Sequence, residues 1–400
     1  MKTSLPIQPL FERAQQYKMQ SLDLVAPMTR INVLPDAQQL EIGDHVGSMT
    51  DHAFAQLCNA LGVPTQYAIR CRDSEYEAPT NIEGHSEVIA RAPMIATHLN
   101  SWLHNPVKDA NKLVRGIEWS TRSLDIGHVV DSTPITWRAL LSDRYFAIDS
   151  FDMLQQAMSV CNSLRSRYGD PVLASGDVTP DRMFAKITFP GMQREIKESR
   201  RVGDIVQWGL FIENNDIGLG KWRVRGFCEW LWCTNGMVST RTLVDSQGNP
   251  LQIERRHVGS KLGLDEDAGI QWGDETRAKA RDVQLSMLRD TIEHILQPDT
   301  FEAEVRVFEH AAANDVRVSD AEKSITKLAK DNVLSDEESK QILHAFLSDN
   351  DSSQFGLAQA ICSDRVAHTL SYDRATKFEH LAYNVIAMPR REWSALALAA

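Results

Sequence analysis

Hydrophobic and polar residues follow three different patterns along the chain, and these patterns predict the class of fold. Residues 1–170 combine helical spacing of apolar positions, as in 49–61, with short β-prone runs, as in 135–141. Residues 171–268 consist of β-prone runs separated by short polar connections, which favour antiparallel hairpins over parallel crossovers. Residues 269–400 have helical spacing throughout. We therefore predict an α+β protein: an antiparallel sheet meander flanked by helices, with an all-helical C-terminal domain.

Individual helices are predicted from apolar spacing together with capping residues. Helices are expected over 10–19, 49–61 and 274–296, and over 86–103 with an interruption at Pro93, since proline removes a backbone donor. Further helices are predicted to begin at the caps Ser150, Ser319 and Ser335 and at the pair Ser352-Ser353, and Ser319 and Ser335 each open a capping box. The bulky Trp102 is expected to anchor the end of its helix against the neighbouring domain.

The composition is that of an ordinary globular protein, with 42% hydrophobic and 24% charged residues. The sequence has neither an N-terminal targeting signal nor a membrane-spanning apolar run, so a cytoplasmic protein is predicted. The six cysteines lie mostly in apolar contexts and are interpreted as reduced core residues. No cofactor or metal site is predicted, because the pairs Asp44-His45 and Asp51-His52 lack further ligands and suit capping and surface roles.

One predicted strand combines cations with aromatic residues. Lys221, Arg223 and Arg225 occupy alternate positions, which in an extended strand point to one face, while Trp222 points to the other. The formal net charge of the chain is −11, which argues against a protein that coats nucleic acid nonspecifically. Residues 191–262, however, hold eleven cations and eight anions. We interpret this segment as a locally cationic sheet in an otherwise acidic molecule.

Four motifs spread along the chain carry a family resemblance. They are Arg138-Ala139-x-Leu141-Ser142-Asp143-Arg144-Tyr145 with Ile148-Asp149, the helix 53–67 ending in Gly-x-Pro-x-x-Tyr, Trp232-Cys233-Thr234-Asn235-Gly236-Met237 with Arg256-His257-Val258-Gly259, and Ser371-Tyr372-Asp373-Arg374-Ala375-Thr376. Together they resemble a family of phage- and plasmid-borne proteins known as a domain of unknown function, over roughly residues 20–390. The resemblance implies a gene setting on mobile elements, beside replication and recombination genes, and no settled activity.

Signatures of common enzyme classes are missing from the sequence. Gly218-Leu219-Gly220-Lys221 resembles the end of a phosphate-binding loop, but Asn215 stands at the position of the first glycine and Trp222 replaces the hydroxyl residue that would hold magnesium. There is no Gly-x-Ser-x-Gly elbow, no His-Glu-x-x-His helix and no dinucleotide-binding fingerprint. No catalytic residue is assigned, and whether the protein is an enzyme stays open.

The leading hypothesis is a phage- or plasmid-encoded protein that binds single-stranded DNA and assists annealing or recombination. On a sheet face, cations follow the phosphates and exposed aromatic rings stack on bases. The candidate binding residues are Arg200, Arg201, Lys221, Arg223, Arg225, Arg241, Arg255, Arg256, Trp208, Trp222 and Trp230. We expect a homo-oligomer built through exposed strand edges or the helical tail, and an acidic helical domain that contacts host or phage proteins.

Two other functions are alternatives to DNA binding. An acidic surface would suit an interaction protein that mimics nucleic acid and blocks a host defence factor. The third hypothesis is a metal-dependent hydrolase that acts on nucleic acid. Co-purifying nucleic acid would favour the first function, a stoichiometric host protein the second, and metal-dependent degradation of an oligonucleotide the third.

Overall fold

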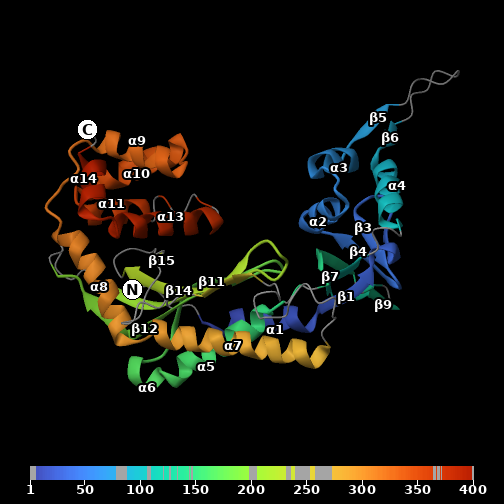
Figure 1. Ribbon diagram of the computed structural model, residues 1–400, viewed down its shortest axis with the longest axis horizontal. Coiled ribbons are helices and arrows are strands. Elements are labelled where there is room, and N and C mark those ends of the chain that lie inside the picture. The colour runs from blue at the N-terminus through green and yellow to red at the C-terminus, as the bar shows by residue number, and fades with distance from the viewer. Residues whose placement is uncertain are drawn as a thin grey trace.

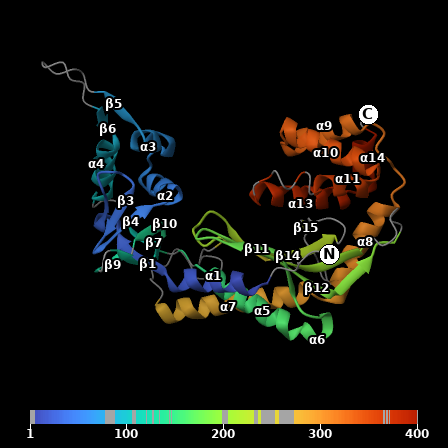
Figure 2. The same ribbon diagram turned by 180° about the vertical axis from the view of Figure 1, so that it is seen from behind.

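A computed structural model describes residues 6–77, 88–105, 110–119, 121–125, 128–132, 134–143, 145, 147–197, 205–230, 236–238, 253–256, 273–363, 366, 370 and 372–398. The outline of the molecule is a U, in which an N-terminal lobe and a C-terminal helical domain stand on the same side of a middle layer (Figure 1). The middle layer is a second β-sheet with helices beneath it, as the view from behind also shows (Figure 2). The predicted α+β class with an all-helical C-terminal region is therefore confirmed.

The N-terminal lobe is built on a mixed six-stranded sheet. Its strands, in spatial order, are β1 (Ser21–Pro27), β7 (Asn111–Glu118), β10 (Ile135–Ser142), β4 (His45–Met49), β3 (Gln39–Ile42) and β2 (Ile31–Val33). Strands β10 and β4 pair in parallel, while the other neighbours are antiparallel. The lobe also contains η1 (Met28–Arg30) and the two-stranded pairs β5 (Glu75–Glu77) with β6 (Val88–Ala90) and β8 (Thr121–Asp125) with β9 (His128–Ser132).

Three helices pack on this sheet, and local signals explain where they begin. They are α2 (Asp51–Leu61), α3 (Thr65–Arg72) and α4 (Ala92–Leu103). Thr50 caps α2, since its hydroxyl accepts a hydrogen bond from the Ala53 amide at 3.1 Å. Pro93 lies in the first turn of α4, where no intrahelical donor is needed, so it begins this helix instead of interrupting one. Trp102 is 42% exposed, which contradicts its predicted role as an anchor packed against a neighbouring domain, and the interruption predicted at Pro93 is also wrong.

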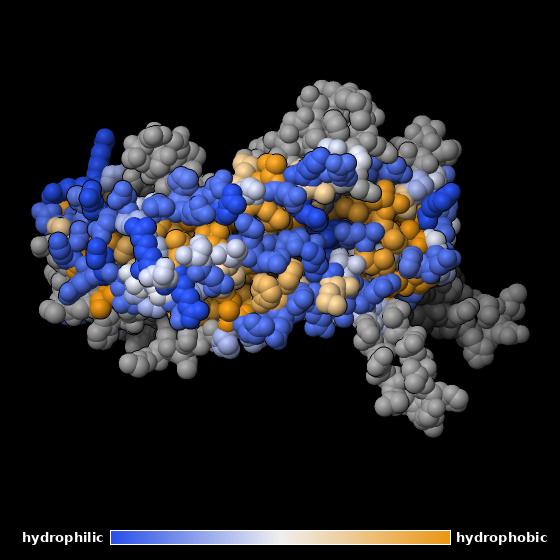
Figure 3. All heavy atoms as spheres, turned by 90° about the horizontal axis from the view of Figure 1, so that it is seen from below, coloured by the Kyte–Doolittle hydropathy of each residue, from blue (hydrophilic) through white to orange (hydrophobic). Residues whose placement is uncertain are grey.

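The central sheet forms the middle layer of the U. It contains β11 (Val172–Val178), β12 (Met183–Glu195), β13 (Ile205–Asn214), β14 (Lys221–Trp230), β15 (Gly236–Val238) and β16 (Ile253–Arg256). Strands β11 to β14 are sequential antiparallel neighbours, but β15 and β16 both pair with β14, so the predicted meander is matched in part. Beneath the sheet lie α1 (Gln8–Met19), α5 (Ser150–Ser163), α6 (Arg165–Tyr168) and α7 (Asp274–Ile295). Seen from below, this side is largely hydrophilic, with apolar patches between the polar side chains (Figure 3).

The helical domain stands above the other face of the central sheet. Its helices are α8 (Pro298–Ala313), α9 (Ala321–Asn332), α10 (Asp336–Asp349), α11 (Gln354–Ile361), α13 (Tyr372–Ile386) and α14 (Arg390–Ala397). Trp393 is fully buried among them, and its indole nitrogen donates to the Val316 carbonyl oxygen at 3.0 Å. Within the ranges described above, no helix has both the length and the apolar character that crossing a membrane requires.

Capping residues decide where the helices of this domain start. Ser335 forms the predicted capping box with Glu338, in which each side chain accepts a hydrogen bond from the other residue's amide. The box predicted at Ser319 is wrong, because the next residue, Asp320, is the cap of α9 and accepts from the amide three positions on. The cap of α5 is Asp149, one residue before the predicted Ser150, whereas α11 is capped by Ser353, which belongs to the predicted pair Ser352-Ser353.

Arg374, which belongs to the fourth motif, connects α13 to the turn between α9 and α10. Its guanidinium donates twice to the Glu338 carboxylate, both at 2.6 Å, and once to the Val333 carbonyl oxygen at 3.1 Å. This hydrogen-bonded ion pair lowers the pKa of Glu338 to about 2. The turn that it holds includes Val333 in the left-handed region at φ 52°, which is unusual for a β-branched residue. We therefore assign Arg374 a structural role.

Candidate functional site

The cationic strand of the sequence analysis is β14, and its alternation is observed. Lys221, Arg223 and Arg225 are half-buried, whereas Trp222 and Val224 between them are fully buried. The buried residues belong to the main core under the central sheet. The three cations therefore lie on the opposite face, as the period of two in a strand requires.

The face that carries these cations is the one turned toward the helical domain. Arg225 is the cross-strand partner of Phe211, which in turn is the partner of Lys186, so all three share a face. Lys186 is buried and forms an ion pair with Glu379 of α13. Its ammonium group also lies 5.3 Å from the centre of the Phe227 ring. The cation row is thus on the inner side of the U, next to the place where α13 covers the sheet (Figure 1).

A neighbouring carboxylate partly neutralises this row. Glu213 is the cross-strand partner of Arg223, and their side chains form an ion pair at 2.7 Å, with 21% and 30% of the side chains exposed. Lys221 and Arg225 also take part in polar or electrostatic interactions within the protein. The positive potential of this face is therefore smaller than the count of cations in the sequence suggests.

The prediction that Trp208 and Trp222 stack on bases is wrong, because both side chains are fully buried. Trp208 donates from its indole nitrogen to the Ile295 carbonyl oxygen at 2.9 Å and stacks on Phe301, with ring centroids 5.9 Å apart. Both tryptophans occupy strand positions that point into the core, where large aromatic side chains bury the most apolar surface. Trp230 ends β14, but its side chain lies outside the described residues.

The remaining predicted cations lie at the margin of the described part of the chain. In the backbone register between β16 and β14, Arg256 is the partner of Lys221 and Arg255 the partner of Trp222. The structure thus brings β16 alongside the cationic half of β14. Arg200, Arg201 and Arg241 lie outside the described residues.

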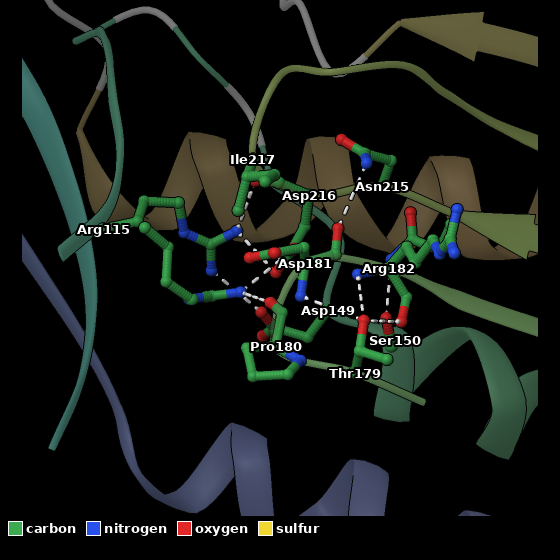
Figure 4. A network of polar contacts seen from close by, with 12 residues as sticks. Arg115, Asp149, Ser150, Thr179, Pro180, Asp181, Arg182, Asn215, Asp216 and Ile217 are labelled. Atoms are coloured by element: carbon green, nitrogen blue, oxygen red, sulfur yellow. Dashed lines mark hydrogen bonds and ion pairs between the residues drawn. The ribbon is translucent and has the colours of Figure 1, made fainter. Parts of the chain in front are cut away.

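A second candidate site is the junction between the N-terminal lobe and the central sheet, which is centred on Arg115 (Figure 4). This arginine of β7 is only 1% exposed, yet it contacts three carboxylates from distant segments. Its guanidinium donates to Asp23 of β1 at 3.0 Å, to Asp149 at the start of α5 at 3.1 Å, and to Asp216 between β13 and β14 at 2.9 Å. It also donates to the backbone oxygen of Asp216 at 2.9 Å.

The first sequence motif converges on this junction. Arg138 of β10 is 4% exposed and donates to the Asp216 carboxylate at 3.4 Å and to the Pro180 carbonyl oxygen. Burial raises the pKa of Tyr145, another motif residue. Burial also raises the pKa of Asp149, although the nearby positive charge of Arg115 opposes this. The motif is therefore explained, at least in Arg138, Tyr145 and Asp149, by its position between two parts of the fold.

The connection between β13 and β14 inserts its tip into the N-terminal lobe. Ile217 at its tip is fully buried, and its carbonyl oxygen lies 2.9 Å from the amide nitrogen of Gln56 and 3.0 Å from the Nε2 atom of His52. The next residue, Gly218, has φ +82°, and a Cβ there would lie 2.6 Å from the Leu141 side chain. Only glycine accommodates both the backbone conformation and this close approach.

The junction holds more acid than base, and it has little free space. The guanidinium groups of Arg115 and Arg138 face four carboxyl groups, because Asp181 beside Arg138 adds to the three that Arg115 contacts. Burial raises the pKa of Asp181 as well. The adjoining cavity, lined by Arg138, Asp149, Thr179 and Asp216 among others, has a volume of about 20 Å³. Such a cavity has room for one water molecule but not for a nucleotide. We therefore interpret the junction as a joint that holds the lobe on the central sheet.

The residues at the centre of this joint were not singled out by sequence patterns. Arg115 stands inside the apolar run Leu113-Val114-Arg115-Gly116-Ile117, and a lone charge in a buried strand is the signal that indicates a hydrogen-bonded partner elsewhere. The sequence does not indicate which acids pair with Arg115, because Asp23 and Asp216 are 92 and 101 positions away from it.

A groove of about 590 Å³ runs between α9 and α10 in the helical domain. It is lined by Glu322, Ile325, Thr326, Ala329, Lys330, Val333, Leu334, Asp336, Ser339, Lys340 and Leu343. Val333 is 83% exposed at its edge. Among the residues that the structure describes, no three His, Cys, Asp or Glu side chains gather closely enough to hold a metal ion.

Comparisons with protein-family models, with curated proteins and with solved structures found no match to this chain.

Proposed function

We propose that this protein binds single-stranded DNA along the inner face of its central sheet and assists annealing or recombination on a phage or plasmid. The main support is the row of Lys221, Arg223 and Arg225, which are partly accessible cations at alternate positions of one strand. A row of cations on a sheet follows the phosphates of a flexible single strand, because the charges lie along one line. The chain as a whole carries −11, so this face is the part most suited to a polyanion.

The test is a titration of a fluorescently labelled oligothymidylate, followed by anisotropy at several salt concentrations. Replacing Arg223 and Arg225 together with Ala should weaken binding and reduce the salt slope by about 1.4, at about 0.7 for each lost phosphate contact. The matched control replaces Arg13 and Arg289, which are about half exposed, lie on α1 and α7, and also have carboxylate partners. The control removes the same charge and should leave the slope unchanged. No retention of the oligonucleotide by the unaltered protein at low salt would reject the proposal.

The ion pair between Glu213 and Arg223 provides a test in the opposite direction. Glu213→Gln removes the carboxylate that competes with phosphate for the guanidinium, and it keeps the size of the side chain. Binding should become about threefold tighter, in line with the strength of a partly exposed pair. A variant that binds more weakly would mean that the pair shapes the binding face instead of competing with DNA.

We also propose that the protein forms homo-oligomers through an exposed strand edge. The sheet of the N-terminal lobe has β1 and β2 as its edges. The side-chain amide of Asn100 covers β2, donating to and accepting from the backbone of Val33 at 2.8 Å. The other edge strand, β1, carries Val25, which is 56% exposed. Light scattering of the purified protein should give a mass above 45.0 kDa, and Val25→Lys should lower it.

The groove between α9 and α10 favours protein interaction as a second candidate function. Its lining includes Ile325, Leu334 and Leu343 together with the exposed Val333, and accessible apolar side chains of this kind are a feature of protein-binding surfaces. A pull-down from host lysate with the unaltered chain and with Val333→Asp compares the two functions. A stoichiometric host protein that only the unaltered chain retains would favour this candidate. Repeating the DNA titration with Mg²⁺ or Mn²⁺ tests the third hypothesis, since a hydrolase would shorten the oligonucleotide.

A further inference from the structure

The exposed aromatic side chains lie away from the cationic strand. Among the described residues, the aromatic side chains in the exposed class are Tyr67 and Trp102, at 50% and 42%. Both belong to the N-terminal lobe, Tyr67 to α3 and Trp102 to α4, and these two helices pack against each other. An aromatic ring must be accessible to stack on a base. Tyr67 and Trp102 are accessible, whereas Trp208 and Trp222 are fully buried.

Helical geometry arranges these side chains in one row. Arg91, His98 and Trp102 are spaced by seven and four residues, so they lie on one side of α4 over about 16 Å at the helical rise per residue. The His98 and Trp102 rings are 6.1 Å apart. At the other end, the Cys71 thiol, one helical turn further along α3, raises the pKa of Tyr67, while the positive charge of Arg91 at the start of α4 lowers it.

The charges beside these rings complement a polyanion. Arg70, three residues after Tyr67 and so on the same side of α3, is exposed and forms no ion pair with any residue that the structure describes. Arg91 at the start of α4 is exposed as well. The nearby Asp73 is already engaged by Arg72 at 2.6 Å. A surface that combines accessible rings with cations, and on which the described acid Asp73 is already paired, suits nucleic acid better than an apolar protein face.

We propose that the row formed by Tyr67, Arg70, Arg91, His98 and Trp102 is a base-stacking surface for single-stranded DNA. This inference rests on the proposed function and extends it. The central sheet supplies phosphate contacts, while the α3–α4 row supplies the ring contacts that the sheet does not. The rings take bases of any sequence, because every base has a π face.

The experiment compares oligothymidylate with an abasic strand of the same length. Tyr67→Ala combined with Trp102→Ala should weaken oligothymidylate binding by about fivefold or more for each ring, at an unchanged salt slope. The unaltered protein should bind the abasic strand more weakly than oligothymidylate, and this difference should shrink in the double variant. Tyr67→Phe combined with Trp102→Phe keeps the rings and should bind as the unaltered protein does. Met94→Ala removes an exposed apolar side chain of α4 without a ring and should change nothing.

The outcomes separate this inference from the proposed function. If the unaltered protein binds neither strand, the proposed function fails, and the inference fails with it. If it binds oligothymidylate and the Ala double variant binds equally well with an undiminished difference between the strands, the stacking surface is refuted while the proposed function stands. Because both side chains are exposed, thermal melting of the variants should match that of the unaltered protein, and a lowered Tm would assign the rings a structural role instead.

Discussion

Replacing Arg115 with Met should release the N-terminal lobe from the central sheet. The substitution keeps most of the apolar volume but removes the donors that hold Asp23, Asp149 and Asp216. Removing one partner of a buried ion pair leaves the other charges unpaired and costs about 3–5 kcal/mol. The matched control is Arg13→Met, whose ion pair is about half exposed and therefore contributes less than about 1 kcal/mol.

The size of this loss should depend on pH, and the sign follows from the carboxyl groups. Burial already raises the folded-state pKa of Asp149 above its ordinary value of 3.8, and loss of the opposing Arg115 charge raises it further. An acid with a raised folded pKa binds more protons in the folded state, so stability falls as pH rises from 3.8 through the folded pKa. The destabilisation in Arg115→Met should therefore be larger at pH 8 than at pH 5.

The measurement is urea unfolding followed by tryptophan fluorescence, since Trp137 is buried in the core of the N-terminal lobe. Adding Asp216→Asn to Arg115→Met removes one of the unpaired charges and should restore part of the lost stability. A loss below about 1 kcal/mol at pH 8, or the same loss at both pH values, would refute the view that this network joins the two parts of the fold.

Two further predictions concern single sites away from the binding faces. Gly218→Ala should lower the free energy of unfolding in urea by about 1–2 kcal/mol or more, because φ is positive there and the new Cβ would lie 2.6 Å from Leu141. The control, Gly220→Ala, places its Cβ only in ordinary contacts and should lower it by less than about 0.5 kcal/mol. Equal losses would contradict the steric reasoning. Glu338→Gln should lower the Tm of the helical domain at neutral pH, because it removes the charged carboxylate that pairs with Arg374. This difference in Tm should vanish as pH falls from 4.5 toward 2, since protonation of Glu338 removes the same charge from the unaltered protein. Circular dichroism at several pH values checks this, and a difference that persists at pH 2 would count against it.

Elements defined by neighbouring residues could be predicted from the sequence. The helix after Thr50, the capping box at Ser335 and the alternation around Trp222 depend on spacing and on hydrogen bonds within a few positions. Such interactions involve only residues a few positions apart and need no contact with distant segments, so the sequence pattern predicts them. The α+β class with a helical C-terminal region follows from the sum of these local signals.

The tertiary structure decided which side chains are accessible and which charges meet. Trp208 and Trp102 look alike in the sequence, yet one is fully buried and the other 42% exposed, because burial depends on what packs over each face. Arg115 meets Asp216, which is 101 positions away, only when the connection between β13 and β14 enters the N-terminal lobe. Spacing along the chain contains no information about such contacts, since their formation depends on the closure of long loops.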